Sequence, residues 1–186
     1  MPRYSVVAIL LHWLIAALIL TNLALGWWMQ TLEGLAQFEK FQLHKSIGIL
    51  VLLLSMLRLL WRAMHKAPPY PETMKPWEKL AASSVHWLLY AIMIGMPLTG
   101  WLLVSTSAFN LPTLLFHMVP WPHLPVHDWP MEARMQLNHL SEGTHKALAF
   151  GTAGLVALHV GAALKHQIIA RDKVLSRMLP RFGRAA

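Results

Sequence analysis

Histidine is the residue type here with the greatest capacity for chemistry, because imidazole binds metal ions and exchanges protons near neutral pH. Eleven of the 186 residues are His. Five lie in connections, where a solvated position is expected: His65, His117, His123, His127 and His139. Six lie in or at the ends of long apolar segments: His12, His44, His86, His145, His159 and His166. Ionisable residues inside membrane-spanning segments are costly and usually face a functional interior, so these six are candidate site residues.

The most informative spacing is that of His145 and His159 on one apolar segment. Fourteen residues at about 100° each come to about 1400°, within about 40° of four whole turns, so both imidazoles are expected on nearly the same side of a helix. Their separation along the axis is about 21 Å, which places one near each membrane face. Two haems stacked in a helical bundle need this arrangement. Gly151 and Gly154 between them reduce the side-chain bulk beside a porphyrin.

His44 is the expected partner of His145. Both open their segments on the same side of the membrane, and each precedes a lysine, Lys45 or Lys146. Those cations are candidates for neutralising haem propionates, and snorkelling at helix ends is the alternative explanation for them. Gly48 lies one helical turn after His44, on its face, which is consistent with a flat ring packing there.

The inner partner of His159 is open to two choices. His12 and His86 both lie near the inner ends of their segments, and each is followed by a tryptophan. Depth does not separate them. His166 lies two helical turns beyond His159 and nearer the surface, so it is the weaker ligand candidate. Two imidazoles on one iron leave no free coordination position, which suits electron transfer rather than oxygen binding.

Four apolar segments carry these histidines. The expected spans are about 5–28, 41–62, 83–105 and 143–167. Each is close to the roughly 20 residues that a bilayer core about 30 Å thick requires. We therefore expect an all-α integral membrane four-helix bundle that forms a single domain over residues 1–186. The connection at 108–142 contains five prolines and an amphipathic stretch at 131–141, and connections of that length are commonly functional.

The composition favours lipid as a partner. Hydrophobic residues make up 56% of the chain and charged residues 13%, whereas soluble domains are about a quarter charged. The net charge of +8 comes from short basic runs beside apolar segments, which is typical of membrane proteins and argues against nucleic-acid binding. The chain has no Cys. That excludes disulfides, thiolate metal sites, cysteine-bound iron–sulfur clusters and covalently attached c-type haem.

The placement of Lys and Arg predicts the orientation. With both termini on one side, that side holds twelve basic residues: Arg3, Arg58, Arg62, Lys66, Lys75, Lys79, Lys165, Arg171, Lys173, Arg177, Arg181 and Arg184. The other side holds four: Lys40, Lys45, Arg134 and Lys146. Because cytoplasmic loops carry the excess of Lys and Arg, both termini are expected in the cytoplasm.

The four segments resemble those of bacterial cytochrome b561. The resemblance rests on LLHWLI, LHKSIGILVLLLSMLRLLWR, VHWLLYAIMIGMPLTGW and THKALAFGTAGLVALHVGAALKH, and it covers about residues 4–170. This family is similar to the cytochrome b subunits of nickel hydrogenases and formate dehydrogenases. The resemblance implies a multi-pass protein of the bacterial inner membrane with two haems b. It implies that His12 and His159 bind the inner haem, and that His44 and His145 bind the outer haem.

The same resemblance releases His86 for another role. Together with His166, it resembles the polar lining of a quinone pocket near the inner haem, where a protonatable side chain exchanges protons with quinone oxygens. A structural hydrogen bond is the alternative for both residues. Arg58 and Arg62 lie at the right depth for the inner haem propionates, and anchoring at the membrane interface explains them equally well.

The resemblance also implies electron transfer. In related small bacterial members, superoxide outside the membrane is oxidised to oxygen and the electron passes through the haems to ubiquinone. The expected function is di-haem electron transfer between an external small donor, with superoxide as the candidate, and membrane ubiquinone. The alternative is a membrane-anchor cytochrome b subunit that passes electrons between a peripheral dehydrogenase or hydrogenase and quinone. A transporter with histidine proton relays is a third class, and it would show no haem absorption bands.

Overall fold

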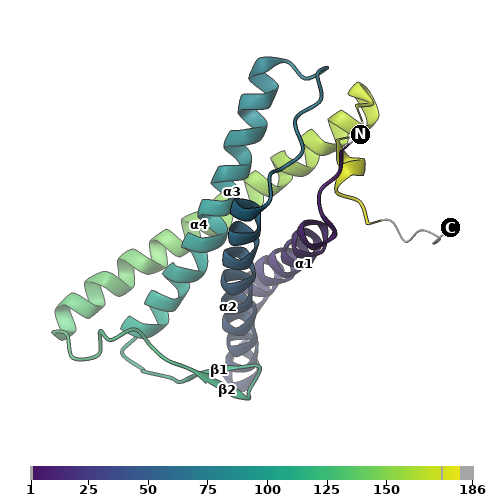
Figure 1. Ribbon diagram of the computed structural model, residues 1–186. Helices are drawn as coiled ribbons and strands as arrows, with labels where there is room; N and C mark the ends of the chain where they lie inside the picture. The colour runs from purple at the N-terminus through teal and green to yellow at the C-terminus, as the bar shows by residue number, and fades with distance from the viewer. Residues whose placement is uncertain (1, 173, 181–186) are drawn as a thin grey trace.

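The computed structural model describes residues 2–172 and 174–180, and most of them are helical (Figure 1). The long helices are α1 (Val6–Trp28), α2 (Gly34–Met64), α3 (Pro76–Thr106) and α4 (Met131–Lys165). Short turns follow two of them: η1 (Met29–Thr31) after α1, and η2 (His166–Ala170) and η3 (Leu175–Arg177) after α4. Between α3 and α4, β1 (Thr113–Leu115) and β2 (Val119–Trp121) pair antiparallel, with Leu114 opposite Pro120.

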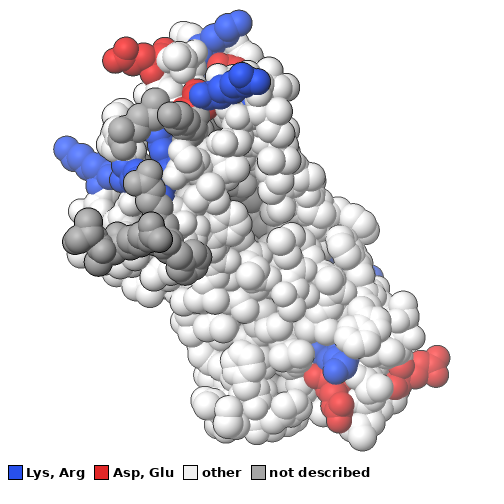
Figure 2. All heavy atoms as spheres, turned by 90° about the vertical axis from the view of Figure 1, so that its right-hand side faces the viewer, with Lys and Arg blue, Asp and Glu red and all other residues white. Residues whose placement is uncertain are grey.

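Four of the helices in the described part of the chain are long and apolar enough to cross a membrane. This finding confirms the expected all-α membrane fold. On the face drawn in Figure 2, charged side chains gather mainly toward the two ends of the molecule, with a broad uncharged region between them. α2, α3 and α4 begin before the expected spans, whereas α1 lies within its own. The span ends stay predictions because a helix can continue past the bilayer. Lys173, Arg181 and Arg184, counted on the cytoplasmic side, lie outside the described residues.

Local sequence explains where the helices begin. The Ser5 hydroxyl caps α1 by accepting a backbone N–H of the first turn at 3.3 Å. Gly34 has a φ of 59°, which lets the chain turn sharply between η1 and α2. Pro76 occupies the first turn of α3, where no backbone donor is needed. There the Glu78 carboxylate accepts the N–H of Lys75 at 3.0 Å, which completes the helix start.

The helices pack in sequence order, α1 on α2, α2 on α3 and α3 on α4. Two small buried clusters hold the bundle. One contains Leu11, Ile15, Tyr90 and Met93, and the other contains Leu25, Ile47 and Val51. Only 6% to 28% of the most apolar stretch of each helix is buried. Most apolar side chains therefore face outward, as they would toward lipid.

The β-hairpin lies against one end of α2, at the bottom of the view in Figure 1. The Ser46 hydroxyl accepts the N–H of Phe116 at 2.9 Å, and the Lys45 ammonium donates to the carbonyl oxygen of Pro112 at 3.3 Å. Phe116 and His117 have φ of 50° and 60°, which are the left-handed values of a tight hairpin turn. Part of the connection expected at 108–142 is therefore an ordered hairpin anchored on α2.

The two ends of the described chain meet at the opposite end of the bundle (Figure 1). The Arg3 guanidinium donates to the carbonyl oxygen of Leu179, and the Trp13 indole donates to that of Met178 at 2.7 Å. Both segments thus lie on the same side, away from the hairpin. Which side faces the cytoplasm stays a prediction, and the hairpin end is called outer and the end with both termini inner as that prediction has them.

Candidate functional site

His44 on α2 and His145 on α4 face each other toward the hairpin end of the bundle. Their ring centres are 6.2 Å apart and their planes are inclined by 80°. Two metal–imidazole bonds of about 2 Å, together with the distance from each nitrogen to its ring centre, come to about 6 Å. The observed separation therefore fits one metal ion between the two rings.

Hydrogen bonds from α3 fix the orientation of the His145 ring. Nδ1 of His145 lies 3.1 Å from the carbonyl oxygen of Met96 and 3.0 Å from the hydroxyl of Thr99. That hydroxyl also donates to Met96 O at 2.7 Å. Since a carbonyl only accepts, Nδ1 of His145 carries the proton, and Nε2 is left as the nitrogen that can bind a metal. Sequence reasoning missed both partners, although a threonine within an apolar span was an available signal.

A cavity opens beside these two rings and draws its walls from all four long helices and the hairpin. Its lining is mostly apolar and includes Asn22, Gly48, Met96, Gly100, Trp101, Trp121 and Thr152. A second cavity shares His44 and His145 and continues between α1 and α4, past Gly26, Trp27 and Phe150. Apolar walls around two facing imidazoles suit a flat, largely apolar ring system such as porphyrin.

Two glycines leave space for the imidazole rings of His145 and His44. A Cβ at Gly100 would lie 3.0 Å from Cε1 of His145, and one at Gly26 would lie 3.1 Å from Cε1 of His44. Both distances are shorter than ordinary van der Waals contact, so each ring packs directly on a glycine backbone. The glycines that the sequence analysis connected with haem have no such contact: a Cβ at Gly48, Gly151 or Gly154 would meet no histidine ring within 4 Å.

Gly100→Ala is therefore expected to lower occupancy of the outer site. The added methyl would push the His145 ring away from α3 and out of the orientation that its hydrogen bonds to Met96 and Thr99 set. The haem-to-protein ratio, measured by pyridine haemochrome assay, should fall measurably below that of the unmodified protein. Gly95→Ala on the same helix is the matched control, since a Cβ there meets nothing within 4 Å among the described residues. Equal haem content in the two variants would contradict this role for Gly100.

At the other end, His159 on α4 lies close to two of the predicted histidines. Its ring centre is 6.1 Å from that of His12 on α1 and 5.4 Å from that of His86 on α3. Nδ1 of His12 is buried and has no hydrogen-bond partner in the described part of the chain. A buried nitrogen without a partner is costly, so this ring has an atom available for a ligand.

The facing histidines fit a metal that is already bound by most of its ligands within a cofactor. Among residues 2–172 and 174–180, no three or more His, Cys, Asp or Glu side chains are grouped to hold a metal ion. Two facing imidazoles are instead sufficient for a porphyrin iron, because the ring supplies the other four nitrogens.

Arg58 and Arg62 lie on α2 toward the inner sites. Their guanidinium carbons are 5.5 Å and 5.7 Å from the centre of the Tyr90 ring, and Arg62 is also 5.7 Å from that of Trp87. Tyr90 follows His86 by one helical turn, so both cations lie near the level of His86. Cation–π contacts of this kind hold a guanidinium beside a partly buried aromatic surface.

Lys45 and Lys146, the two lysines at the hairpin end, both contact other groups of the protein. Lys45 is only 9% exposed, beneath the hairpin, with its ammonium 5.0 Å from the centre of the Phe41 ring. Lys146 is exposed and forms an ion pair with Glu142 at 2.6 Å. Burial, and less strongly the nearby charge of Lys45, lowers the pKa of His123. The position of Lys45 and Lys146 at helix ends in the sequence predicted their depth, but it did not predict the groups that they contact.

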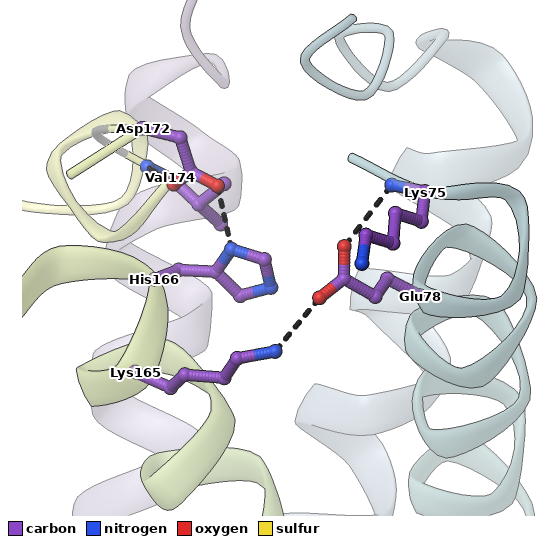
Figure 3. A network of polar contacts seen from close by, with 6 residues as sticks. All are labelled: Lys75, Glu78, Lys165, His166, Asp172 and Val174. Carbon is purple, nitrogen blue, oxygen red and sulfur yellow. Dashed lines mark hydrogen bonds and ion pairs between the residues drawn. The ribbon is translucent and has the colours of Figure 1, made fainter. Parts of the chain in front are cut away.

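His166 lies in a polar network where the end of α4 meets the start of α3 (Figure 3). Its Nδ1 is 2.5 Å from a carboxylate oxygen of Asp172. The neighbouring Lys165 forms an ion pair with Glu78 at 2.7 Å. No hydrogen bond or ring contact joins His166 to His86 among the described residues. Asp172 was missed by sequence reasoning, because it follows the last predicted span.

Four membrane-spanning helices with facing histidines at two depths are the architecture of a transmembrane b-type cytochrome. The sequence matches the family model described as Prokaryotic cytochrome b561 over residues 3–181. The chain belongs to this family. It is therefore a haem b protein of membrane electron transfer, and a multi-pass protein of the bacterial inner membrane.

Relatives of similar length support this assignment. Cytochrome b561 homolog 2 of Escherichia coli K12 is 32% identical over 179 residues, which cover 95% of this chain and 91% of that protein. Cytochrome b561 homolog 1 of the same organism is 29% identical over 97% of this chain and 99% of its own length. Probable superoxide oxidase CybB of Yersinia pestis is 27% identical, covering 96% and 97%. The resemblance noted from the four segments is thus confirmed.

Proposed function

We propose that this protein is a di-haem cytochrome that transfers electrons across the membrane from superoxide, as the external donor, to membrane ubiquinone. The observation that carries the proposal is the pair of facing imidazoles at each of two depths on α4. His145 and His159 are about 21 Å apart along the helix axis, so each depth has room for a haem of its own. The relative named a probable superoxide oxidase supports superoxide as the donor.

The proposed ligands are His44 and His145 for the outer haem and His12 and His159 for the inner haem. The 6.1 Å separation of His12 and His159 repeats the 6.2 Å of the outer pair, whereas His86 lies at 5.4 Å, and this supports His12 as the inner ligand. When bound, haem b would supply a one-electron carrier, and ligation by two imidazoles would leave its iron no position for oxygen.

Cationic side chains near each site are the candidates for propionate binding. Arg58 and Arg62 are proposed for the inner haem, where their stacking on Tyr90 holds them in place. Lys146 is the more accessible outer candidate, because it is exposed and would exchange one surface ion pair for another. Lys45 would have to leave the carbonyl oxygen of Pro112, which makes it the weaker candidate.

His86 and His166 are proposed to serve ubiquinone on the inner side. The reaction balances when two superoxide anions each lose one electron and become oxygen, while one ubiquinone gains both electrons and two protons and becomes ubiquinol. Those protons have to reach the quinone oxygens, and positioned imidazoles are efficient proton donors near neutral pH.

Stopped-flow spectroscopy tests this function. The purified protein is mixed with a superoxide source, and reduced b-type absorption bands are expected to appear and then to decay when a soluble ubiquinone is added. Added superoxide dismutase, which removes the donor, should abolish the reduction. If superoxide leaves the haems oxidised in the absence of dismutase, the superoxide part of the proposal is wrong.

A second candidate function is that of an anchor subunit for a peripheral dehydrogenase. It is favoured by the large apolar side chains exposed around the hairpin: Phe109 is 83% exposed, Met118 77% and Val119 55%. Exposed apolar patches of this kind commonly mark protein or membrane contacts. Purification in mild detergent separates the candidates, because an accessory dehydrogenase that copurifies and reduces the haems would support the anchor role.

A further inference from the structure

His166 and Asp172 form a largely buried pair at the end of α4 (Figure 3). Nδ1 of His166 lies 2.5 Å from Oδ2 of Asp172, and Oδ1 of Asp172 accepts the N–H of Val174 at 3.2 Å. The two side chains are only 12% and 4% exposed. Each carboxylate oxygen therefore has a partner within the protein, and the imidazole is held in one orientation.

An irregular helix end creates this pair. The last turn of α4 passes into the π-helical turn η2, and Arg171 then takes a left-handed conformation with φ of 51°. This reversal lets the backbone N–H of Asp172 bond to the carbonyl oxygen of His166 at 3.2 Å. The carboxylate of Asp172 is thereby returned to the ring of the residue six positions earlier. π-helical turns are frequent at functional sites.

We propose that Asp172 is a positioning residue for proton delivery to ubiquinone. By accepting a hydrogen bond from Nδ1 of His166, it fixes the ring so that Nε2 carries the proton to be transferred whenever the imidazole is protonated on both nitrogens. This inference rests on the proposed function, in which His166 serves the quinone. The protonated ring gives its Nε2 proton to a quinone oxygen as the quinone is reduced, and then takes up a proton from water. Asp172 orients the ring and does not itself give a proton to the quinone, as with the carboxylate partner of a catalytic histidine.

The neighbouring carboxylate of Glu78 leaves Nε2 of His166 available for proton transfer. In Figure 3 the second ring nitrogen of His166 points away from Asp172, toward the α3 side of the network. Among residues 2–172 and 174–180, the His166 ring bonds through Nδ1 to Asp172. The Glu78 carboxylate on α3 is occupied by Lys165 at 2.7 Å and by the backbone N–H of Lys75 at 3.0 Å. Asp172 is thus the carboxylate that bonds to the ring.

Asp172→Asn in the full-length protein tests the inference. The haems are reduced with dithionite, and their reoxidation by a soluble ubiquinone is followed by stopped flow. Reoxidation is expected to be about tenfold slower or more, the usual cost of losing a carboxylate that orients a functional histidine. Ferricyanide takes an electron without a proton, so reoxidation by ferricyanide should keep its normal rate. The solvent deuterium isotope effect on the quinone reaction should increase.

Glu78→Gln is the matched control, because it breaks the ion pair with Lys165 in the same network without removing a hydrogen bond to His166. Its quinone rate should stay near that of the unmodified protein. If Asp172→Asn slows quinone and ferricyanide equally, the residue is only structural and the inference is wrong. If His166→Gln is slow with quinone while Asp172→Asn is normal, the inference fails and the proposed quinone role of His166 stands. If both variants are normal, that role of His166 fails as well.

Discussion

Purified His145→Ala protein is expected to contain one haem b per chain instead of two, with the outer one lost. His145 faces His44 at 6.2 Å, and its Nδ1 is held by Met96 and Thr99, so its Nε2 is set toward the site. The chain has no Cys that could attach haem covalently. A haem held by two imidazoles is therefore expected to dissociate when one of them is removed. The pyridine haemochrome assay measures the remaining haem, and a redox titration should resolve one component where the unmodified protein has two.

The pairing of His44 with His145 is tested by a double mutant. His44→Ala should lose the same haem, and the double variant should resemble either single one, because residues of one site act as a unit. His139→Ala is the matched control, since His139 is exposed on the same helix and should leave both haems bound. Loss of both haems in the double variant would contradict the pairing, because it would assign the two residues to different sites.

Regular α-helical geometry predicted that His145 and His159 share one face of α4. Their depth predicted His44 as the partner of His145, but depth left both His12 and His86 open as partners of His159. Fourteen residues of helix return a side chain to nearly the same face, and the structure brings His44 to His145 and His12 to His159. The four-helix membrane fold was equally accessible, since long uncharged segments have few other solutions in a bilayer. The ligand roles of the four histidines stay predictions.

Other features could not be predicted, each for a physical reason. Three-residue strands are too short to show alternation, so the hairpin at 113–121 left no pattern in the sequence. The hydrogen bond from His145 to Met96 uses a backbone carbonyl, which every residue carries. Asp172 reaches His166 only because the helix ends in a π-helical turn and a left-handed residue. Tertiary contacts of this kind depend on where segments meet rather than on local composition.

Substitutions at the inner site should give the second large effect. His12 and His86 both lie beside His159, but their replacement by Ala is expected to change different properties of the protein. His12→Ala should lose the inner haem, since its ring has the spacing of the outer pair and a buried nitrogen without a partner among the described residues. His86→Ala should keep both haems. Its reoxidation by ubiquinone should be about a hundredfold slower, the usual contribution of a positioned proton donor.

Haem content and reoxidation kinetics, measured on the same preparations, separate these two roles. His65→Ala is the matched control on the same side, because His65 is exposed and stacks on Trp61 with ring centres 3.8 Å apart, away from His159. It should change neither measurement. If His86→Ala loses a haem while His12→Ala retains both, His86 is the ligand and the 5.4 Å contact is the coordinating one. His12 would then be the residue left to serve the quinone, and the proton path would begin on α1 instead of α3.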